Sequence, residues 1–316
     1  MRVLVTGASG HIASALIPEL LDHGHRVVGL ARSERSAAAV AALGAEARRG
    51  DLDNLDGLRE AAAEAEGVIH LAYKHDAMQR GDIVSAASAD IAAIEAMGQA
   101  LAGSGRPLVA TGGTLMLAVG GIAGRPGTED DVLAGGGARI DSENAVVALA
   151  ERGVRSSYVR LAPLVHSDLD QHGFTPALIG FALEHGGAAY IGDGGNRWPA
   201  AHTRDIAVLY RLALEKAPAG SRLHGVGDEG IAFKVLAETI ASGLGLPARS
   251  VSAEEAPAHL GFLALFAHLD NPTSNAHTRQ LLGWEPTHPG WVEDVRSGHY
   301  FARPHGRTAS AQALGQ

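Results

Sequence analysis

Short apolar runs alternate with helix-patterned segments from the first residue, and this alternation constrains the fold more than any other feature. The runs RVLVTG, RVVGLA and GVIHLA read as buried strands, and each is followed by apolar residues at helical spacing. Parallel strands joined by helices connect with a right-handed crossover, which puts helices on both faces of one sheet. The sequence therefore predicts an α/β fold with a doubly wound parallel sheet over residues 1–165.

The rhythm loosens after Val165, and residues 166–316 read as a smaller, mostly helical part that binds substrate. Within it, residues 203–216 form a strongly periodic helix that we expect to pack back on the sheet. No repeat, low-complexity tract or Pro/Ser-rich linker separates the two parts. We therefore expect them to pack into one another, with a cleft between them.

Charge and composition narrow the classes of partner. The formal net charge is −9, and an acidic surface repels both nucleic acid and anionic membranes. The absence of cysteine removes disulfides and thiolate chemistry, and no run approaches the ~20 apolar residues of a membrane span. The N-terminus does not resemble a signal peptide. We expect a cytoplasmic protein without a metal, a nucleic-acid partner or a membrane partner.

A glycine cluster, VTGASGHIA, lies between the first strand and the first helix. Gly7 permits a tight turn there, and Gly10 lets backbone N–H groups approach a pyrophosphate at the positive end of the helix. Ala13 is small enough for close packing of helix on strand. Strand, turn and helix in this order predict a Rossmann-type dinucleotide site, with cofactor contacts from Gly7, Ser9, Gly10, His11 and Ile12.

The end of the second strand indicates which dinucleotide is bound. An NAD site places a carboxylate about 20 residues after the glycine turn, to bind the ribose 2′-hydroxyl. The sequence GLARS has Ala31 there, followed by Arg32 and Ser33, with Arg35 close by. An arginine beside a hydroxyl suits a 2′-phosphate in charge and in donor geometry. NADP(H) is therefore the predicted cofactor.

Several motifs along the chain resemble the short-chain dehydrogenase/reductase superfamily, in particular its extended and atypical, epimerase/dehydratase-like branches. The motifs are TGASGHIA, GDLDN, VIHLA, VRLAPLVHS, IGDGGNRWPAAHTRDIAVLYRLALE and TRQLLGWEPTHPG. The resemblance implies that Asp51 and Leu52 contact the adenine. It also implies that Leu71 and Ala72 approach the nicotinamide ribose, and that Pro163 and Val165 lie near the carboxamide. Pairing through helices of the dinucleotide domain is common in the superfamily, so a homodimer is consistent with it.

The sequence departs from the superfamily at the catalytic groups. Members carry a Ser or Thr after the fifth strand and a Tyr-x-x-x-Lys pair at a helix start. The Ser or Thr holds the carbonyl oxygen of the substrate, and the Tyr, assisted by the Lys, donates a proton to that oxygen. Thr111 and Thr114 are the hydroxyl candidates. Glu143 matches a family glutamate, and counting back from it puts Arg139 at the lysine position and Gly135 at the tyrosine position. The usual proton donor is absent.

Two main interpretations follow from this departure. In the first, the protein is an NADPH-dependent oxidoreductase that reduces a hydrophobic ketone, with Thr111, Thr114 and Arg139 among its catalytic groups. Tyr73 is the best candidate for the proton donor, and the alternatives are Lys74, His75, Asp76, His166 and His202. In the second, it is a non-catalytic NADP(H)-binding sensor or scaffold. A sugar-nucleotide epimerase or dehydratase is a weaker alternative, because a diphosphate needs more basic residues than Arg197 and Arg204. The candidate substrate pocket consists of His75, Gly135, His166, Phe174, Leu178, Trp198 and His202.

Overall fold

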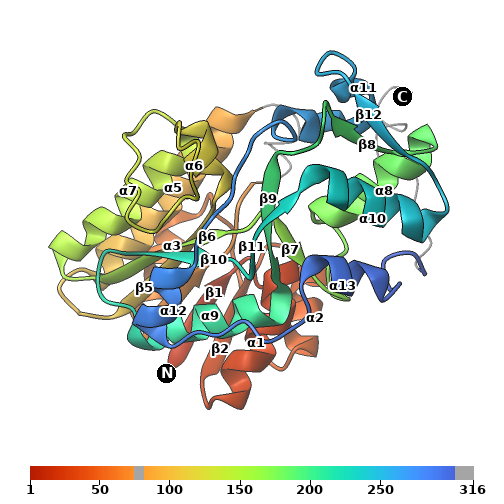
Figure 1. Ribbon diagram of the computed structural model, residues 1–316. Coiled ribbons are helices and arrows are strands. Elements are labelled where there is room, and N and C mark those ends of the chain that lie inside the picture. Colours follow the sequence, from red (N-terminus) through yellow and green to blue (C-terminus); the bar gives the residue numbers. More distant parts are fainter. Residues whose placement is uncertain (75–81, 303–316) are drawn as a thin grey trace.

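A seven-stranded parallel sheet forms the centre of the computed structural model, which describes residues 1–74 and 82–302 (Figure 1). The strand order is β10-β6-β5-β4-β1-β2-β3, and the chain order reverses direction beside β1. This is the predicted doubly wound α/β fold. The strands are β1 (Arg2–Thr6), β2 (Arg26–Ala31), β3 (Glu46–Arg49), β4 (Gly67–His70), β5 (Pro107–Gly113), β6 (Arg155–Leu161) and β10 (Ser221–Gly225).

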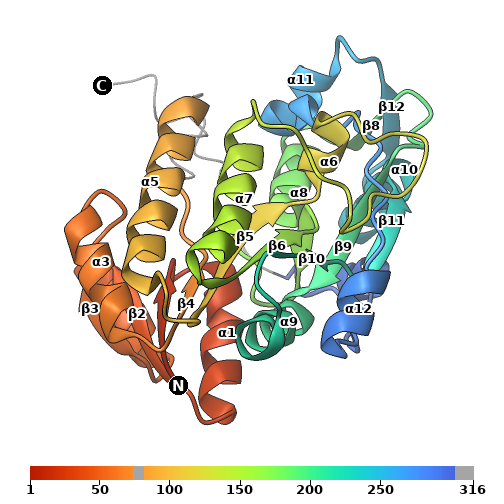
Figure 2. The same ribbon diagram turned by 90° about the vertical axis from the view of Figure 1, so that its left-hand side faces the viewer.

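Helices cover both faces of this sheet, as Figure 2 shows. On one face α1 (His11–Asp22) lies beside α9 (Thr203–Lys216), and on the other α5 (Ile83–Leu101) lies between α3 (Leu55–Glu64) and α7 (Ala138–Ala148). Alternate strand residues therefore enter two separate cores: Val3 and Val5 pack on the α1 side and Leu4 on the α5 side. Helix α2 (Glu34–Ala42) packs against the β2–β3 edge.

The two parts of the chain interleave. Helix α9 spans the residues that the periodicity indicated, and it packs against α1, β4 and β5. Strand β10 also comes from beyond residue 165, and it pairs with β6 as the edge strand of the main sheet. A segment of the C-terminal region thus completes the main sheet.

The rest of the C-terminal region surrounds two small sheets. One has the order β11-β9-β7 and the other pairs β12 with β8. These strands are β7 (Leu164–His166), β8 (Ala188–Ile191), β9 (Arg197–His202), β11 (Asp228–Ala232) and β12 (Ala248–Val251). The helices are α8 (Phe174–His185), α10 (Phe233–Leu244), α11 (Ala256–Leu260), α12 (Ala276–Leu282) and α13 (Trp291–Arg296), and short α6 (Leu115–Val119) follows β5.

This region has its own hydrophobic core, and the core absorbs residues that we expected to line a substrate pocket. Trp198 has no exposed surface, and Leu178 is buried in the same hydrophobic cluster. The cavity among Leu178, Phe181 and their neighbours is about 10 Å³, which is no larger than one water molecule. The expectation that Trp198 and Leu178 contact substrate therefore conflicts with the structure, because close packing leaves Trp198 no free surface and Leu178 only 6% of its own.

A buried ionic network fixes α7 to the sheet. The Arg160 guanidinium, 1% exposed, donates to both carboxylate oxygens of Glu143, to the Thr128 and Asp131 carbonyls and to His224 Nε2. All five of its N–H groups are thereby satisfied. Glu143 also accepts from Arg222 Nε at 2.6 Å. The glutamate matched to the family helix is thus a structural anchor.

His224 makes the stability of this network sensitive to acid. Burial, against the opposing charge of Glu129, lowers the pKa of His224 to about 4 from 6.5. Its stabilising contribution is therefore complete above about pH 6.5 and is lost as the pH falls toward about 4, because only the unfolded chain takes up the proton there. We expect a loss of about 3 kcal/mol over this range. Urea unfolding across this range measures the loss. His224→Gln, whose amide offers a donor and an acceptor but does not titrate, should remove it, and an unchanged pH dependence in that variant contradicts the assignment.

No helix within residues 1–74 and 82–302 is long and apolar enough to cross a membrane.

Candidate functional site

The turn between β1 and α1 has the geometry that a dinucleotide requires. Gly7 adopts φ +67°, and a Cβ on it would lie 2.8 Å from the backbone nitrogen of Ala72. Gly10 is the N-cap of α1 and donates its N–H to the Gly7 carbonyl at 2.9 Å. Ser9 and Gly10 are exposed at the carboxyl edge of the sheet. Glycine is needed at position 7 both for the backbone conformation and for the close approach of the segment after β4.

The first turn of α1 completes this cradle. The first N–H groups of a helix have no partner within it, and they attract anions. His11 and Ile12 are half-buried there, and His11 Nε2 shares a hydrogen bond with Thr203 Oγ1 at 2.7 Å. Helix α9 therefore fixes the side chain that borders the turn. The residues present fit a bound pyrophosphate, with Gly7, Ser9, Gly10, His11 and Ile12 around it.

The end of β2 presents a basic, exposed edge. Arg32 is exposed, and Arg49 from β3 reaches its backbone carbonyl at 3.4 Å. The Ser33 hydroxyl caps α2 by accepting from the Ser36 N–H at 3.1 Å. Glu34, 3.3 Å from Arg49, is an exposed acidic residue at this edge. Two arginines and the start of α2 thus gather at the end of β2, where the sequence predicts the 2′-phosphate site.

The remaining cofactor candidates lie at the same carboxyl edge. Asp51 accepts the backbone N–H groups of Asp53 and Asn54, so its carboxylate shapes the turn after β3, while Leu52 is buried in the core. Leu71 and Ala72, half-buried, follow β4 directly beside the glycine turn. Pro163 and Val165 are half-buried at the β6–β7 junction.

A buried chain of polar side chains begins directly before the glycine turn. Thr6 Oγ1 is 2.7 Å from His70 Nδ1, and it also accepts the Ala72 N–H at 3.2 Å. His70 Nε2 is 3.1 Å from one oxygen of Asp90, whose other oxygen accepts from Arg139 Nη1 at 3.2 Å. Thr6, His70 and Asp90 are at most 2% exposed. This chain connects β1, β4, α5 and α7.

Arg139 links this chain to Tyr73. Its guanidinium carbon lies 4.0 Å from the centre of the Tyr73 ring, a cation–π contact. Burial raises the pKa of the half-buried Tyr73 hydroxyl, the Arg139 charge lowers it, and the Asp90 charge adds to the rise. Burial also opposes the ionisation of Asp90, but His70 and Arg139 outweigh it and hold the pKa of that carboxyl below its usual value. Tyr73 is therefore protonated and Asp90 ionised at neutral pH.

Both threonine candidates at the end of β5 are engaged. Thr111 Oγ1 donates to the His70 carbonyl at 2.8 Å and lies 2.8 Å from the Tyr210 hydroxyl. Thr114 has no exposed surface, and its hydroxyl accepts from Asn271 at 2.9 Å. Thr111 is half-buried beside the polar chain, whereas the burial of Thr114 runs against the expected contact with a substrate carbonyl.

Gly135, at the position of the missing tyrosine, is exposed in a turn that closes on Asp141. The Gly136 N–H donates to Asp141 Oδ1 at 3.0 Å, and a Cβ on Gly135 would lie 2.8 Å from the same oxygen. The glycine-rich segment before α7 is thus stabilised by a carboxylate of the same helix.

Two of the histidine candidates, His166 and His202, lie together, with ring centres 5.4 Å apart. His166 is fully buried and lies 2.8 Å from Asp294, and His202 is buried at the end of β9. Phe174 packs on Trp198 with ring centres 5.9 Å apart. His75 lies outside the described residues. Burial thus removes His166 and His202 from the expected substrate surface.

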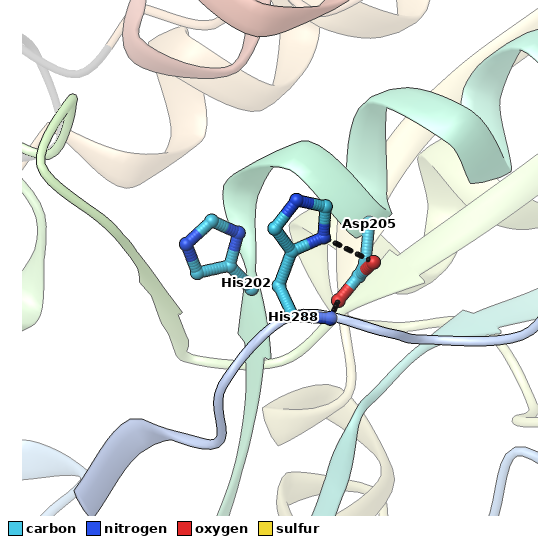
Figure 3. A group of neighbouring side chains, drawn as sticks. All are labelled: His202, Asp205 and His288. Atoms are coloured by element: carbon cyan, nitrogen blue, oxygen red, sulfur yellow. Dashed lines mark hydrogen bonds and ion pairs between the residues drawn. The ribbon is translucent and has the colours of Figure 1, made fainter. Parts of the chain in front are cut away.

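His202, Asp205 and His288 are close enough to suggest a metal site, with ligand atoms within 4.8 Å of one another (Figure 3). The geometry argues against it. The two imidazole rings stack with planes 4° apart and centres 4.5 Å apart, and a metal must lie near the plane of each ring that binds it. Asp205 accepts from His288 Nδ1 and from the Thr287 and His288 N–H groups, so it anchors the C-terminal loop.

Sequence reasoning missed Asp90, the residue that joins His70 to Arg139. A signal was present, because Asp90 is a lone carboxylate on the apolar face of the helix, three residues after Ala87 and four before Ile94. Asn271 and Tyr210, the partners of the two threonines, gave no comparable signal because they come from segments far along the chain.

The glycine turn, the open helix terminus and the strand reversal beside β1 define a dinucleotide-binding protein of the doubly wound class. The chain belongs to the NAD-dependent epimerase/dehydratase family, an extended branch of the short-chain dehydrogenase/reductase superfamily. The model of this family matches residues 3–131.

Relatives extend the likeness over nearly the whole chain. An uncharacterized protein of Schizosaccharomyces pombe is 45% identical over 95% of this chain and all of its own length. A ketoreductase of Stigmatella aurantiaca that acts on a farnesylated dihydroquinoline oxide is 28% identical over 70% of this chain and 66% of its own. The crystal structure of DesIV, a dTDP-glucose 4,6-dehydratase of Streptomyces venezuelae, superposes with a TM-score of 0.75 at 19% identity, covering 95% of this chain and 97% of that one.

Proposed function

We propose that the protein is an NADPH-dependent reductase that converts an apolar ketone to an alcohol. The observation that carries the proposal is the contact between Arg139 and Tyr73 in the segment beside the glycine turn. Tyr73 offers a protonated phenol in a chain that has Gly135 at the position of the family's tyrosine. The family supports an NAD(P)-dependent oxidoreductase, epimerase or dehydratase. The similarity to a ketoreductase favours a ketone among these substrates.

Tyr73 fits the role of proton donor in the reductive direction. When bound, the reduced nicotinamide supplies hydride to the carbonyl carbon, and the oxygen then requires a proton. The phenol of Tyr73 stays protonated at neutral pH because burial raises its pKa. The Arg139 charge stabilises the phenolate that remains after proton transfer. The lysine of the Tyr-x-x-x-Lys pair has this role in other members. Thr111, in hydrogen-bond contact with Tyr210 and the His70 carbonyl, borders the same edge.

The choice of NADPH rests on the edge after β2. Arg32→Asp should raise the Kd for NADPH at least tenfold, because charge-assisted contacts to phosphate are worth about 1.5–3 kcal/mol, and should leave the Kd for NADH unchanged or lower. Fluorescence titration with both cofactors measures the change. Arg26→Asp, the same charge change at the far end of β2, is the matched control and should change neither Kd. Equal effects of Arg32→Asp on both cofactors contradict the assignment.

The basic side chains of the C-terminal region favour a neutral substrate over a sugar nucleotide. Arg197 donates to both carboxylate oxygens of Asp270, at 2.8 and 3.0 Å. Arg204 likewise donates to both oxygens of Asp168. A diphosphate would have to displace these carboxylates. Phe262, 40% exposed and 6.0 Å from the Phe174 ring, and the more exposed Leu265 offer apolar surface instead.

One observation favours a non-catalytic alternative, in which the protein senses NADP(H). Thr114 is fully buried on Asn271, so the hydroxyl nearest the family position has no access to a carbonyl. Turnover decides between the two functions. Loss of NADPH absorbance with a panel of aryl and aliphatic ketones supports the reductase. Saturable NADPH binding without turnover on the whole panel supports the sensor and overturns the reductase.

A further inference from the structure

We infer that Asp90 is a positioning residue that holds the Arg139 guanidinium against the face of Tyr73. Its consequence for catalysis rests on the proposed function, but the positioning itself does not. Asp90 lies on α5 and is 1% exposed, while Arg139 comes from α7 and Tyr73 from the segment after β4. The carboxylate is thus a buried anchor for Arg139, which meets Tyr73 from a different element.

The two carboxylate oxygens of Asp90 contact different partners, Arg139 and His70. Oδ2 accepts from Arg139 Nη1 at 3.2 Å, and Oδ1 lies 3.1 Å from His70 Nε2. One carboxylate therefore balances the charge of Arg139 and also fixes its direction. Because Arg139 is partly exposed, with a side-chain exposure of 22%, it has room to turn toward solvent if this anchor is removed.

His70 is in turn fixed by Thr6. The Thr6 hydroxyl accepts the Ala72 N–H, so its own proton is available for His70 Nδ1, 2.7 Å away. His70 then carries its proton on Nε2 and donates it to Asp90. Since Thr6 directly precedes Gly7, the order runs from the phosphate turn through His70 and Asp90 to Arg139 and Tyr73. Asp90 thereby links the geometry of the turn to the position of the proton donor.

The other polar groups around Arg139 do not replace Asp90. The Tyr158 hydroxyl donates to the Arg139 backbone carbonyl at 3.2 Å, which fixes the main chain. Tyr158 and Tyr210 also interact with the guanidinium, but they are phenols, and the carboxylate that pairs with it is Asp90. Tyr210 is bound to Thr111. Lys74, the next charged residue after Tyr73, pairs with Asp53. Loss of the Asp90 charge should therefore move the arginine.

Asp90→Asn tests the inference by two readouts. The Arg139 Nε–Hε NMR signal, assigned with Arg139→Lys, should lose the ring-current shift caused by Tyr73 and move to its position in Tyr73→Leu. In ketone reduction, kcat should fall about 10- to 100-fold while the Kd for NADPH stays within about twofold, because a displaced group costs rate rather than cofactor affinity. Glu95→Gln, on the same helix in an exposed pair with Arg152, is the matched control and should change neither readout.

An Arg139 signal that keeps its shift in folded Asp90→Asn overturns the inference, and an unchanged kcat when the signal moves overturns its consequence for catalysis. If the wild-type protein turns over no ketone, the proposed function fails and the NMR signal alone decides the positioning. Should Asp90→Asn fail to fold, Arg139→Gln tests the pair from its exposed end with the same loss of kcat. Where both variants fold, the kcat of the Asp90→Asn, Arg139→Gln double variant should equal that of the slower single variant. Losses of kcat that add together contradict the coupling.

Discussion

Tyr73→Phe is expected to lower kcat for NADPH-dependent ketone reduction by about 10²- to 10⁴-fold, the usual contribution of a positioned general acid. The ring and its contact with Arg139 persist in this variant, so the Kd for NADPH should change little. Steady-state kinetics and a fluorescence titration of NADPH measure the two quantities. Because burial raises the pKa of Tyr73, wild-type kcat should show no loss of the donor from about pH 6 to about pH 9.

Tyr190→Phe is the control for this experiment. Tyr190 is half-buried on β8, beside Lys234 and in the C-terminal core, so loss of its hydroxyl should leave kcat unchanged. A Tyr73→Phe protein that retains more than half of the wild-type kcat would show that another group delivers the proton.

Glu143→Gln is expected to reduce the free energy of unfolding by about 3–5 kcal/mol, the cost of breaking a buried ion pair at one partner. The substitution keeps the shape of the side chain but leaves Arg160 and Arg222 without their shared negative charge. It should also loosen α7, which carries Arg139. Urea unfolding monitored by far-UV circular dichroism measures the change.

Glu151→Gln gives the matched comparison, because this glutamate is exposed just after α7. Its free energy of unfolding should stay within about 0.5 kcal/mol of wild type. A Glu143→Gln protein as stable as Glu151→Gln would refute the role of Glu143 as the anchor of the helix.

The fold and the glycine turn after β1 were predictable from the sequence because both depend on local patterns. Strand runs, helical spacing and the glycines after the first strand each lie within a few residues of one another. Helix 203–216 was visible for the same reason. That α9 packs beside α1, and that β10 joins the sheet from residue 221, depends instead on tertiary pairing.

The site was predictable only in part. Tyr73 and Arg139 were identified one by one, from a loop and from a position in a helix, but their contact and its dependence on Asp90 arise where α5 packs against α7. The substrate pocket was misjudged at Trp198 and Leu178, because apolar residues at helical or strand spacing look the same in a pocket and in a core. Only the burial of these side chains in the structure distinguishes core residues from pocket residues.

The most direct test of the account is transfer of deuterium from NADPH labelled at the transferred position of the nicotinamide ring. After incubation with the wild-type protein and an apolar ketone from the panel, mass spectrometry of the alcohol measures the label. The account predicts an alcohol that carries one deuterium, formed by the wild type and about 10²- to 10⁴-fold more slowly by Tyr73→Phe. Binding of NADPH with no labelled alcohol from any ketone of the panel would contradict it.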